Sequence, residues 1–371
     1  MQESDLPGLT ATVLWAAFAL AVAFGAIAQR THFCTMGAVA DIVNLGDWTR
    51  MRMWVLAIAV AMIGFNAMVA AGWVQAANTV YAGPSLLWLS NIVGGLLFGI
   101  GMVLASGCGS KTLVRVGGGN LKSLVVLFVL AVAAYATMRG VFAVARVATL
   151  DAAVITLPTG QDLPSLLAHA SGASRQSMAL WVGGGLGLLL LGWVLWRPEG
   201  RAGEVLLAGV GIGAVIIGVW WVSGRLGFLA EHPVTLEESF LATNSRRMES
   251  LSFVAPVAYT MDWLILFSDT SRVLTLGIVS VLGVMLGSAG VALAGGSFRW
   301  EGFAGAEDTA NHVVGALLMG AGGVTAVGCT VGQGLSGVST LALGSFLALA
   351  GILAGGVLGV RYQVWRVERS L

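Results

Sequence analysis

The sequence has little charge. Asp, Glu, Lys and Arg together make up 10% of its 371 residues, whereas soluble domains carry about 25%. Hydrophobic residues make up 57% of the chain, and the mean hydropathy is +0.88. This composition excludes a water-soluble globular domain, and it also excludes a disordered chain, which needs low hydrophobicity and high charge. Most of the chain is therefore expected to lie in lipid.

Neither sign of charge dominates, and cysteine is scarce. The 19 Lys and Arg face 18 Asp and Glu, so the sequence has no broad basic surface and we expect no nucleic-acid partner. The three cysteines, Cys34, Cys108 and Cys329, are too few for a disulfide scaffold. Because three is an odd number, at least one thiol stays free or serves as a ligand.

Long uncharged runs are abundant. Nine of them are suited to cross a hydrocarbon core of about 30 Å as helices, and together they hold 191 residues without one Asp, Glu, Lys or Arg. The runs are residues 10–29, 53–74, 86–108, 123–138, 178–196, 205–222, 273–298, 313–335 and 337–360. They are continuous rather than alternating, which excludes barrel strands. The sequence predicts an all-α integral membrane protein with about nine transmembrane helices in the lipid bilayer.

The basic residues predict the orientation. With nine spans and the N-terminus outside, the inside loops and the C-terminus hold 12 Lys and Arg, and the outside segments hold 7. Those seven fall in the long connections 139–177 and 223–272, which we expect to contain interfacial helices. The first 28 residues have no basic leader region, so we expect no cleaved signal peptide.

An internal repeat lies around two of the cysteines. Residues 94–108 align without gaps with residues 315–329, and nine of the fifteen positions are identical, including the final Gly-Cys. Transporters are often built from such repeats, with the substrate site at the repeat interface. We therefore expect a single transport domain over 1–371, with a first half at 1–138, a second half at 273–371, and spans five and six within the connecting part 139–272.

Each cysteine lies where one apolar run stops and another helical stretch begins. Gly107 and Gly328 directly precede the second and third cysteine, and Gln333 follows the third. A helix broken at membrane depth is tolerated only where protein buries it or water lines it, so we predict re-entrant loops around a cavity. Helix N-termini favour anions and lower thiol pKa values.

The side chains around these breaks suit a soft ligand. Three polarizable thiols indicate either a sulfur-containing anion or a thiophilic metal. Arg30, Lys111 and Arg115 lie near two of the cysteines in sequence, where they could attract a small anion. Simpler interpretations stay open: a single cysteine in an apolar helix is usually a packing residue, and the three basic residues could be membrane-edge anchors.

These motifs resemble the YeeE/YedE family of bacterial membrane proteins. The matching segments are Gln29-Arg30 with Phe33-Cys34, residues 98–108 with Arg115 and Gly117, and residues 315–335 around Cys329. The resemblance implies an hourglass-shaped helical transporter that imports thiosulfate through a relay of Cys34, Cys108 and Cys329, without changing the ion chemically and without a cofactor or metal. It implies a bacterial inner-membrane location and a cytoplasmic TusA-like sulfurtransferase as partner. The distribution of basic residues predicts a periplasmic N-terminus and a cytoplasmic C-terminus. Lys111 departs from the family pattern.

Other functions stay open at this stage. A membrane sulfurtransferase would hold persulfide sulfur on a nucleophilic cysteine. A transporter of another sulfur or selenium species is a further alternative. A Cu(I) permease would use the thiolates as ligands, but no Met-x-x-Met cluster stands at either terminus. A structural subunit would tolerate loss of the thiols. The P-loop of an ATPase is absent, because Leu104 stands where its first glycine belongs.

Overall fold

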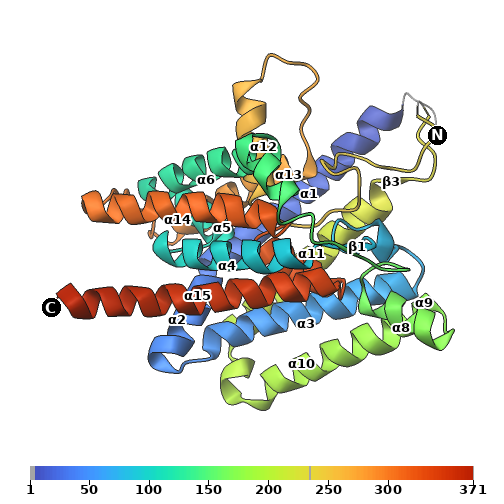
Figure 1. Cartoon of the computed structure of the whole chain (residues 1–371), viewed down its shortest axis with the longest axis horizontal. Coiled ribbons are helices and arrows are strands. Elements are labelled where there is room, and N and C mark those ends of the chain that lie inside the picture. Colours follow the sequence, from blue (N-terminus) through green and yellow to red (C-terminus); the bar gives the residue numbers. More distant parts are fainter. Residues whose placement is uncertain (1–4, 234, 371) are drawn as a thin grey trace.

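The computed structural model of the protein describes residues 5–233 and 235–370, and most of it is helical (Figure 1). Within these residues, eight helical segments are long and apolar enough to cross a membrane. The long helices are α1 (Leu6–Arg30), α3 (Thr49–Ala70), α4 (Trp88–Leu104), α6 (Leu121–Arg139), α10 (Gly184–Trp196), α11 (Gly203–Trp221), α13 (Leu276–Ala294), α14 (Ala306–Thr325) and α15 (Leu343–Ser370). The prediction of an all-α membrane protein is confirmed.

Shorter elements connect and supplement these helices. They are α2 (Thr35–Leu45), α5 (Gly109–Gly117), α7 (Val141–Ala148), α8 (Leu163–Ser171), α9 (Arg175–Met178), α12 (Ala255–Ile265), η2 (Ala76–Asn78), η3 (Ala179–Gly183), η4 (Pro198–Arg201), η5 (Val222–Leu226) and η6 (Gly332–Gly337). Two small antiparallel pairs complete the fold: β1 (Ser85–Leu86) with β2 (Ile155–Thr156), and β3 (Phe228–Leu229) with β4 (Ser239–Phe240). The long connections thus contain short helices, as the sequence predicts.

The predicted run that is missing from these eight segments is the one at α14. Its first turns carry Glu307, Asp308 and His312, yet the helix packs along both α4 and α6. The predicted run 313–335 is only partly a spanning helix, because α14 ends at Thr325 and the rest of the run re-enters the protein and forms η6.

The chain reverses into the last helix at residues 338–342, where Leu341 has a φ of 59°. The helical stretch η6 just before this turn is fully buried, and a Cβ on Gly337 would collide with the Ser345 hydroxyl. Close packing therefore explains the glycine at position 337.

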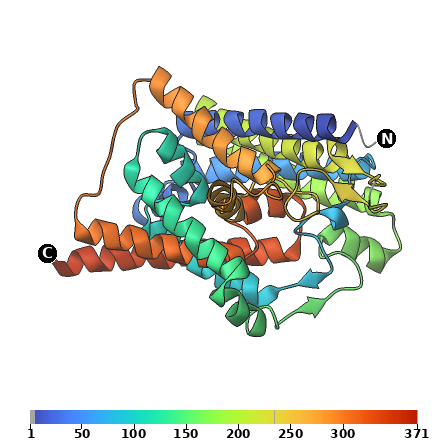
Figure 2. The same cartoon turned by 90° about the horizontal axis from the view of Figure 1, so that it is seen from above.

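The two chain ends lie at opposite ends of the helix bundle (Figure 1). We call these ends the N face, where residue 5 lies, and the C face, where residue 370 lies. Both small β pairs are on the side of the N face in Figure 2, together with much of the long connections. The bundle therefore has one face covered by folded connections and another with shorter ones.

Glycines bring α4 close to two neighbours. A Cβ built on Gly322 would lie 2.5 Å from the Phe98 nitrogen and 2.6 Å from the Gly94 oxygen, so the backbones of α4 and α14 touch. On the other side of α4, a Cβ on Gly95 would lie 2.5 Å from the Ala348 oxygen of α15. Small residues of this kind let membrane helices approach closely, where packing and not the hydrophobic effect holds them together.

Replacing Gly322 by Ala should lower the melting temperature of the purified protein, because the new methyl group would push α14 away from α4. Overpacking of this kind costs about 1–3 kcal/mol. Gly185→Ala on α10 is the matched control, since nothing lies within 4 Å of its Cβ position, and we expect it to change stability by less than about 1 kcal/mol. Thermal unfolding in detergent measures both, and equal effects would contradict the close packing.

Candidate functional site

The same backbone break precedes each of the three cysteines. After α1, α4 and α14 the chain passes through one residue in the left-handed conformation: His32 with φ 52°, Ser106 with φ 55° and Val327 with φ 58°. The cysteine follows two residues later in each case. Non-glycine residues adopt this conformation at a cost of about 1–2 kcal/mol. Because it occurs at all three sites, we identify the three breaks as one recurring structural motif.

Hydrogen bonds close each break. The N–H of Gly107 donates to the Met102 carbonyl at 2.8 Å, and the N–H of Gly328 donates to the Gly323 carbonyl at the same distance. The N–H of Phe33 donates to the Ala28 carbonyl at 3.2 Å. These bonds satisfy the last carbonyls of each helix, which is required where water is scarce.

Each cysteine begins the next helical stretch and is a free, buried thiol. Cys34 precedes α2, and its sulfur accepts the Gly37 N–H at 3.4 Å. Cys329 precedes η6 and accepts the Gly332 N–H, also at 3.4 Å. Cys108 precedes α5, and its sulfur lies 3.3 Å from the Ser110 hydroxyl. The exposed fraction is 7% for Cys34 and 0% for the other two thiols.

The cysteines form a series with Cys108 in the middle. Cys108 is a near neighbour of both Cys34 and Cys329. Lys111 is a basic neighbour of Cys34, and Tyr81, whose hydroxyl is neutral, is a neighbour of Cys329. The two ends of the series therefore differ in the polar group that lies near them.

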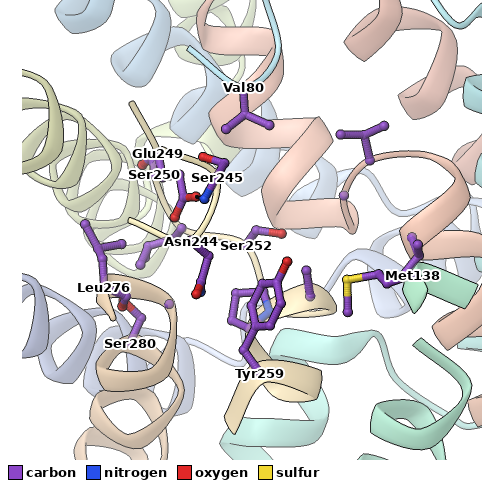
Figure 3. A pocket seen from close by; sticks show the side chains of 18 of the residues that line it. Val80, Met138, Asn244, Ser245, Glu249, Ser250, Ser252, Tyr259, Leu276 and Ser280 are labelled. Atoms are coloured by element: carbon purple, nitrogen blue, oxygen red, sulfur yellow. Dashed lines mark hydrogen bonds between the residues drawn. The ribbon is translucent and has the colours of Figure 1, made fainter. Parts of the chain in front are cut away.

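A cavity of about 360 Å³ lies at the Cys329 end, near the N face. Its lining includes Val327 and Gly328 from the third break, and Tyr81, whose hydroxyl is hydrogen-bonded to Ser252. Its other lining residues come mainly from α6, α12 and α13 and from the segment 244–252. Figure 3 shows the polar groups of that segment on one side of the cavity and Met138 on the other.

Glu249 is the acidic residue of this N-face cavity. One oxygen of its carboxylate accepts the Ser245 N–H at 2.7 Å. Burial raises the pKa of Glu249 above its ordinary value, and the hydrogen bonds from residues 244 and 245 oppose that shift. Arg139 and Arg146 line the same cavity, so its charge is mixed, and Arg146 is paired with Asp151 at 3.2 Å.

A second cavity, of about 470 Å³, lies at the Cys34 end near the C face. Two predicted residues, Lys111 and Arg115, line it together with His32 and Ser106 of the first two breaks. Arg30 does not line it: this side chain is exposed at the end of α1. The basic groups therefore gather at this cavity, although one of the three expected residues stands apart.

Three further residues that the sequence predicted, Gly107, Gly328 and Gln333, lie at the second and third breaks. A Cβ on Gly107 would be 3.3 Å from the Lys111 side chain, and a Cβ on Gly328 would be 3.1 Å from that of Gln333. Gln333 is buried, and its amide nitrogen donates to the carbonyl of Ala326, the last residue before the third break. Gln333 thus stabilises the loop that carries Cys329.

Sequence reasoning missed several groups near the cysteines. Glu249 and Tyr81 come from connections that carry no recognisable motif. Thr35 and Thr330 each follow a cysteine directly, and this repeated Cys-Thr pair was the signal available in the sequence. In the described ranges, no three or more His, Cys, Asp or Glu side chains converge as a metal site would.

Burial predicts low reactivity of all three thiols in the folded protein. A bulky maleimide should label the native protein slowly, with Cys34 first because it alone is partly exposed. After denaturation without reductant, all three free thiols should react. Intact-mass spectrometry measures the number of labels. Rapid labelling of Cys108 or Cys329 in the native protein would contradict the burial, and fewer than three labels after denaturation would indicate a disulfide.

Comparisons with known proteins agree with this architecture. The chain is similar to the thiosulfate transporter TsuA of Escherichia coli K12, with 26% identity over 344 residues and 89% of each protein covered. It is 28% identical to TsuA of Spirochaeta thermophila over 348 residues, which cover 91% of this chain and 94% of that protein. An 87-residue part, 24% of the chain, is 34% identical to the probable transporter YedE of Salmonella typhimurium, of which it covers 20%. Residues 30–358 match the model of the family described as Sulphur transport. Because that match covers most of the chain, the protein belongs to this family, the YeeE/YedE family that its cysteine motifs resemble.

Proposed function

We propose that this protein imports a small sulfur-containing anion, thiosulfate first, along the series Cys329, Cys108 and Cys34. The observation that carries the proposal is the threefold use of one helix break, with a buried thiol after each break and a cavity near each end of the series. A thiol donates a weak hydrogen bond and is polarizable, so it suits the soft terminal sulfur of thiosulfate. The names of the two TsuA relatives support this choice of substrate.

The proposed direction is from the N face to the C face. The loops expected inside carry more Lys and Arg, which favours a cytoplasmic C face and a periplasmic N face in a bacterial inner membrane. Lys111 and Arg115 would attract the dianion toward the C-face cavity. The halves 1–138 and 273–371 would supply the three cysteines, with 139–272 as the connecting part.

The ion would leave the relay chemically unchanged, so the protein itself would not be an enzyme. No cofactor takes part in the proposed path. A cytoplasmic sulfurtransferase of the TusA type would take the anion or its sulfur at the C face, as the family resemblance implies. The other functional class, a membrane sulfurtransferase, would instead keep sulfur on one cysteine as a persulfide, and the experiment below distinguishes the two.

Single Cys→Ala variants should lose uptake while they still fold. Each replacement removes one sulfur atom from a buried site, and we expect uptake of thiosulfate labelled on its outer sulfur to fall at least about tenfold, the effect of 1.4 kcal/mol on the transfer step. The assay uses cells that lack other sulfur-anion importers. Val194→Ala on α10 is a control for a buried truncation away from the relay, and its uptake should stay close to wild type.

Two outcomes would contradict the relay. The first is wild-type uptake by a well-expressed Cys329→Ala protein. The second is a stable persulfide on Cys34, Cys108 or Cys329 of the purified wild-type protein after exposure to thiosulfate, which would favour the sulfurtransferase. Mass spectrometry of the same preparation detects that adduct.

The raised pKa of Glu249 predicts a pH dependence of uptake. Above that pKa the carboxylate is negative and repels an arriving dianion, so uptake should increase as the pH falls through it. Glu249→Gln should raise uptake at pH 8 by about threefold and flatten the profile. Measurement of initial rates from pH 5 to pH 8 tests this, and a variant with the wild-type profile would remove Glu249 from the path.

A further inference from the structure

Two buried hydroxyl groups beside the relay have no hydrogen-bond partner among the described residues. They are the side-chain oxygens of Thr35 and Thr330, whose exposed fractions are 2% and 0%. A buried polar group left unpaired costs about 1–3 kcal/mol, so each such group calls for an explanation. Both threonines directly follow a cysteine, Cys34 in one case and Cys329 in the other.

Four other buried threonines are satisfied within their own helical turns. The hydroxyls of Thr112, Thr137, Thr260 and Thr325 donate to the carbonyl four residues earlier, at 2.7–2.9 Å. Thr35 cannot do so because it is the first residue of α2 and the preceding turn is broken. Thr330 is four residues after Ala326, but the third break lies between them, and the Ala326 carbonyl accepts the Gln333 amide and not the Thr330 hydroxyl. The breaks themselves thus leave both hydroxyls without the usual acceptor.

The neighbouring sulfurs are held by backbone donors. The Gly37 N–H donates to the Cys34 sulfur and the Gly332 N–H donates to the Cys329 sulfur. Since each sulfur accepts a bond from its own loop, its S–H is left to donate to another group. Each Cys-Thr pair therefore carries one thiol donor and one unpaired hydroxyl on consecutive residues.

The middle cysteine is built differently. The residue after Cys108 is Gly109, and the nearest hydroxyl, that of Ser110, is hydrogen-bonded to the thiol itself. Cys108 therefore lacks the second donor that the outer two cysteines have. The arrangement gives two equivalent subsites at the ends of the series and a different one between them.

We infer that Cys34-Thr35 and Cys329-Thr330 are paired-donor subsites that bind the two chemical ends of an oxygen-bearing sulfur anion, the hydroxyl donating to an oxygen while the thiol donates to the terminal sulfur. The inference rests on the proposed function and deepens it. The hydroxyls select an anion that carries both oxygen and sulfur over a sulfur anion without oxygen. Binding of the anion gives both unpaired hydroxyls a hydrogen-bond acceptor. It thereby removes the free-energy cost of burying them unpaired.

The test removes each hydroxyl without changing the side-chain shape. Thr35→Val and Thr330→Val should weaken thiosulfate binding about tenfold or more, measured by calorimetry on the purified protein, because a hydrogen bond to a charged group is lost. Thr35→Ser and Thr330→Ser should restore most of the affinity. Affinity for trithiocarbonate, a sulfur dianion without oxygen, should stay within about twofold of wild type. Thr137→Val on α6 is the control, since its hydroxyl is already bonded to Ala133.

Thermal unfolding separates binding from folding. Without ligand the two site Val variants should be as stable as wild type or more stable, because they lose an unpaired buried hydroxyl, whereas thiosulfate should raise their melting temperature less than that of wild type. Val variants with wild-type thiosulfate affinity, or with unstable folds, would overturn the inference. Equal weakening for both dianions would do the same. A wild-type protein that binds no thiosulfate would overturn the proposed function as well.

Discussion

A helix that stops inside a bilayer must satisfy its own backbone, and this constraint governs the whole site. No water is at hand in the hydrocarbon region to accept the freed hydrogen bonds. Here the same solution occurs three times: one residue in the left-handed conformation, a hydrogen bond from the chain back to the helix end, and a cysteine whose sulfur caps or adjoins the next helical stretch. The thiols are therefore part of the structure that makes the breaks possible.

The breaks depend in turn on close packing of the helices that carry them. α4 and α14 meet backbone to backbone through glycines, and α4 also packs against α15. Contact at this range fixes the ends of α4 and α14, and hence the positions of Cys108 and Cys329. Wider spacing at the interface would move the two thiols relative to each other, so the glycines of this interface help to fix the relative positions of Cys108 and Cys329.

The sequence predicted the fold class and a break at each of the three cysteines, because charge segregation, a gapless repeat and the ends of the apolar runs are visible in the residue pattern. It did not predict that the break before Cys34 has the same geometry, since that segment lacks the Gly-Cys pair. Nor did it indicate that the left-handed residue is the one before the glycine in the repeat, a serine in one copy and a valine in the other. Glu249 and the orphan hydroxyls depend on contacts between distant segments, which a single sequence does not record.

The central claim is that a sulfur anion passes along the three thiols. The most direct test is a structure of the protein soaked or frozen with selenosulfate, in which selenium replaces the terminal sulfur and its anomalous signal locates that atom. The account predicts selenium peaks in contact with Cys329, Cys108 or Cys34. Selenium found only at sites remote from all three thiols, in protein that transports the ion, would contradict it.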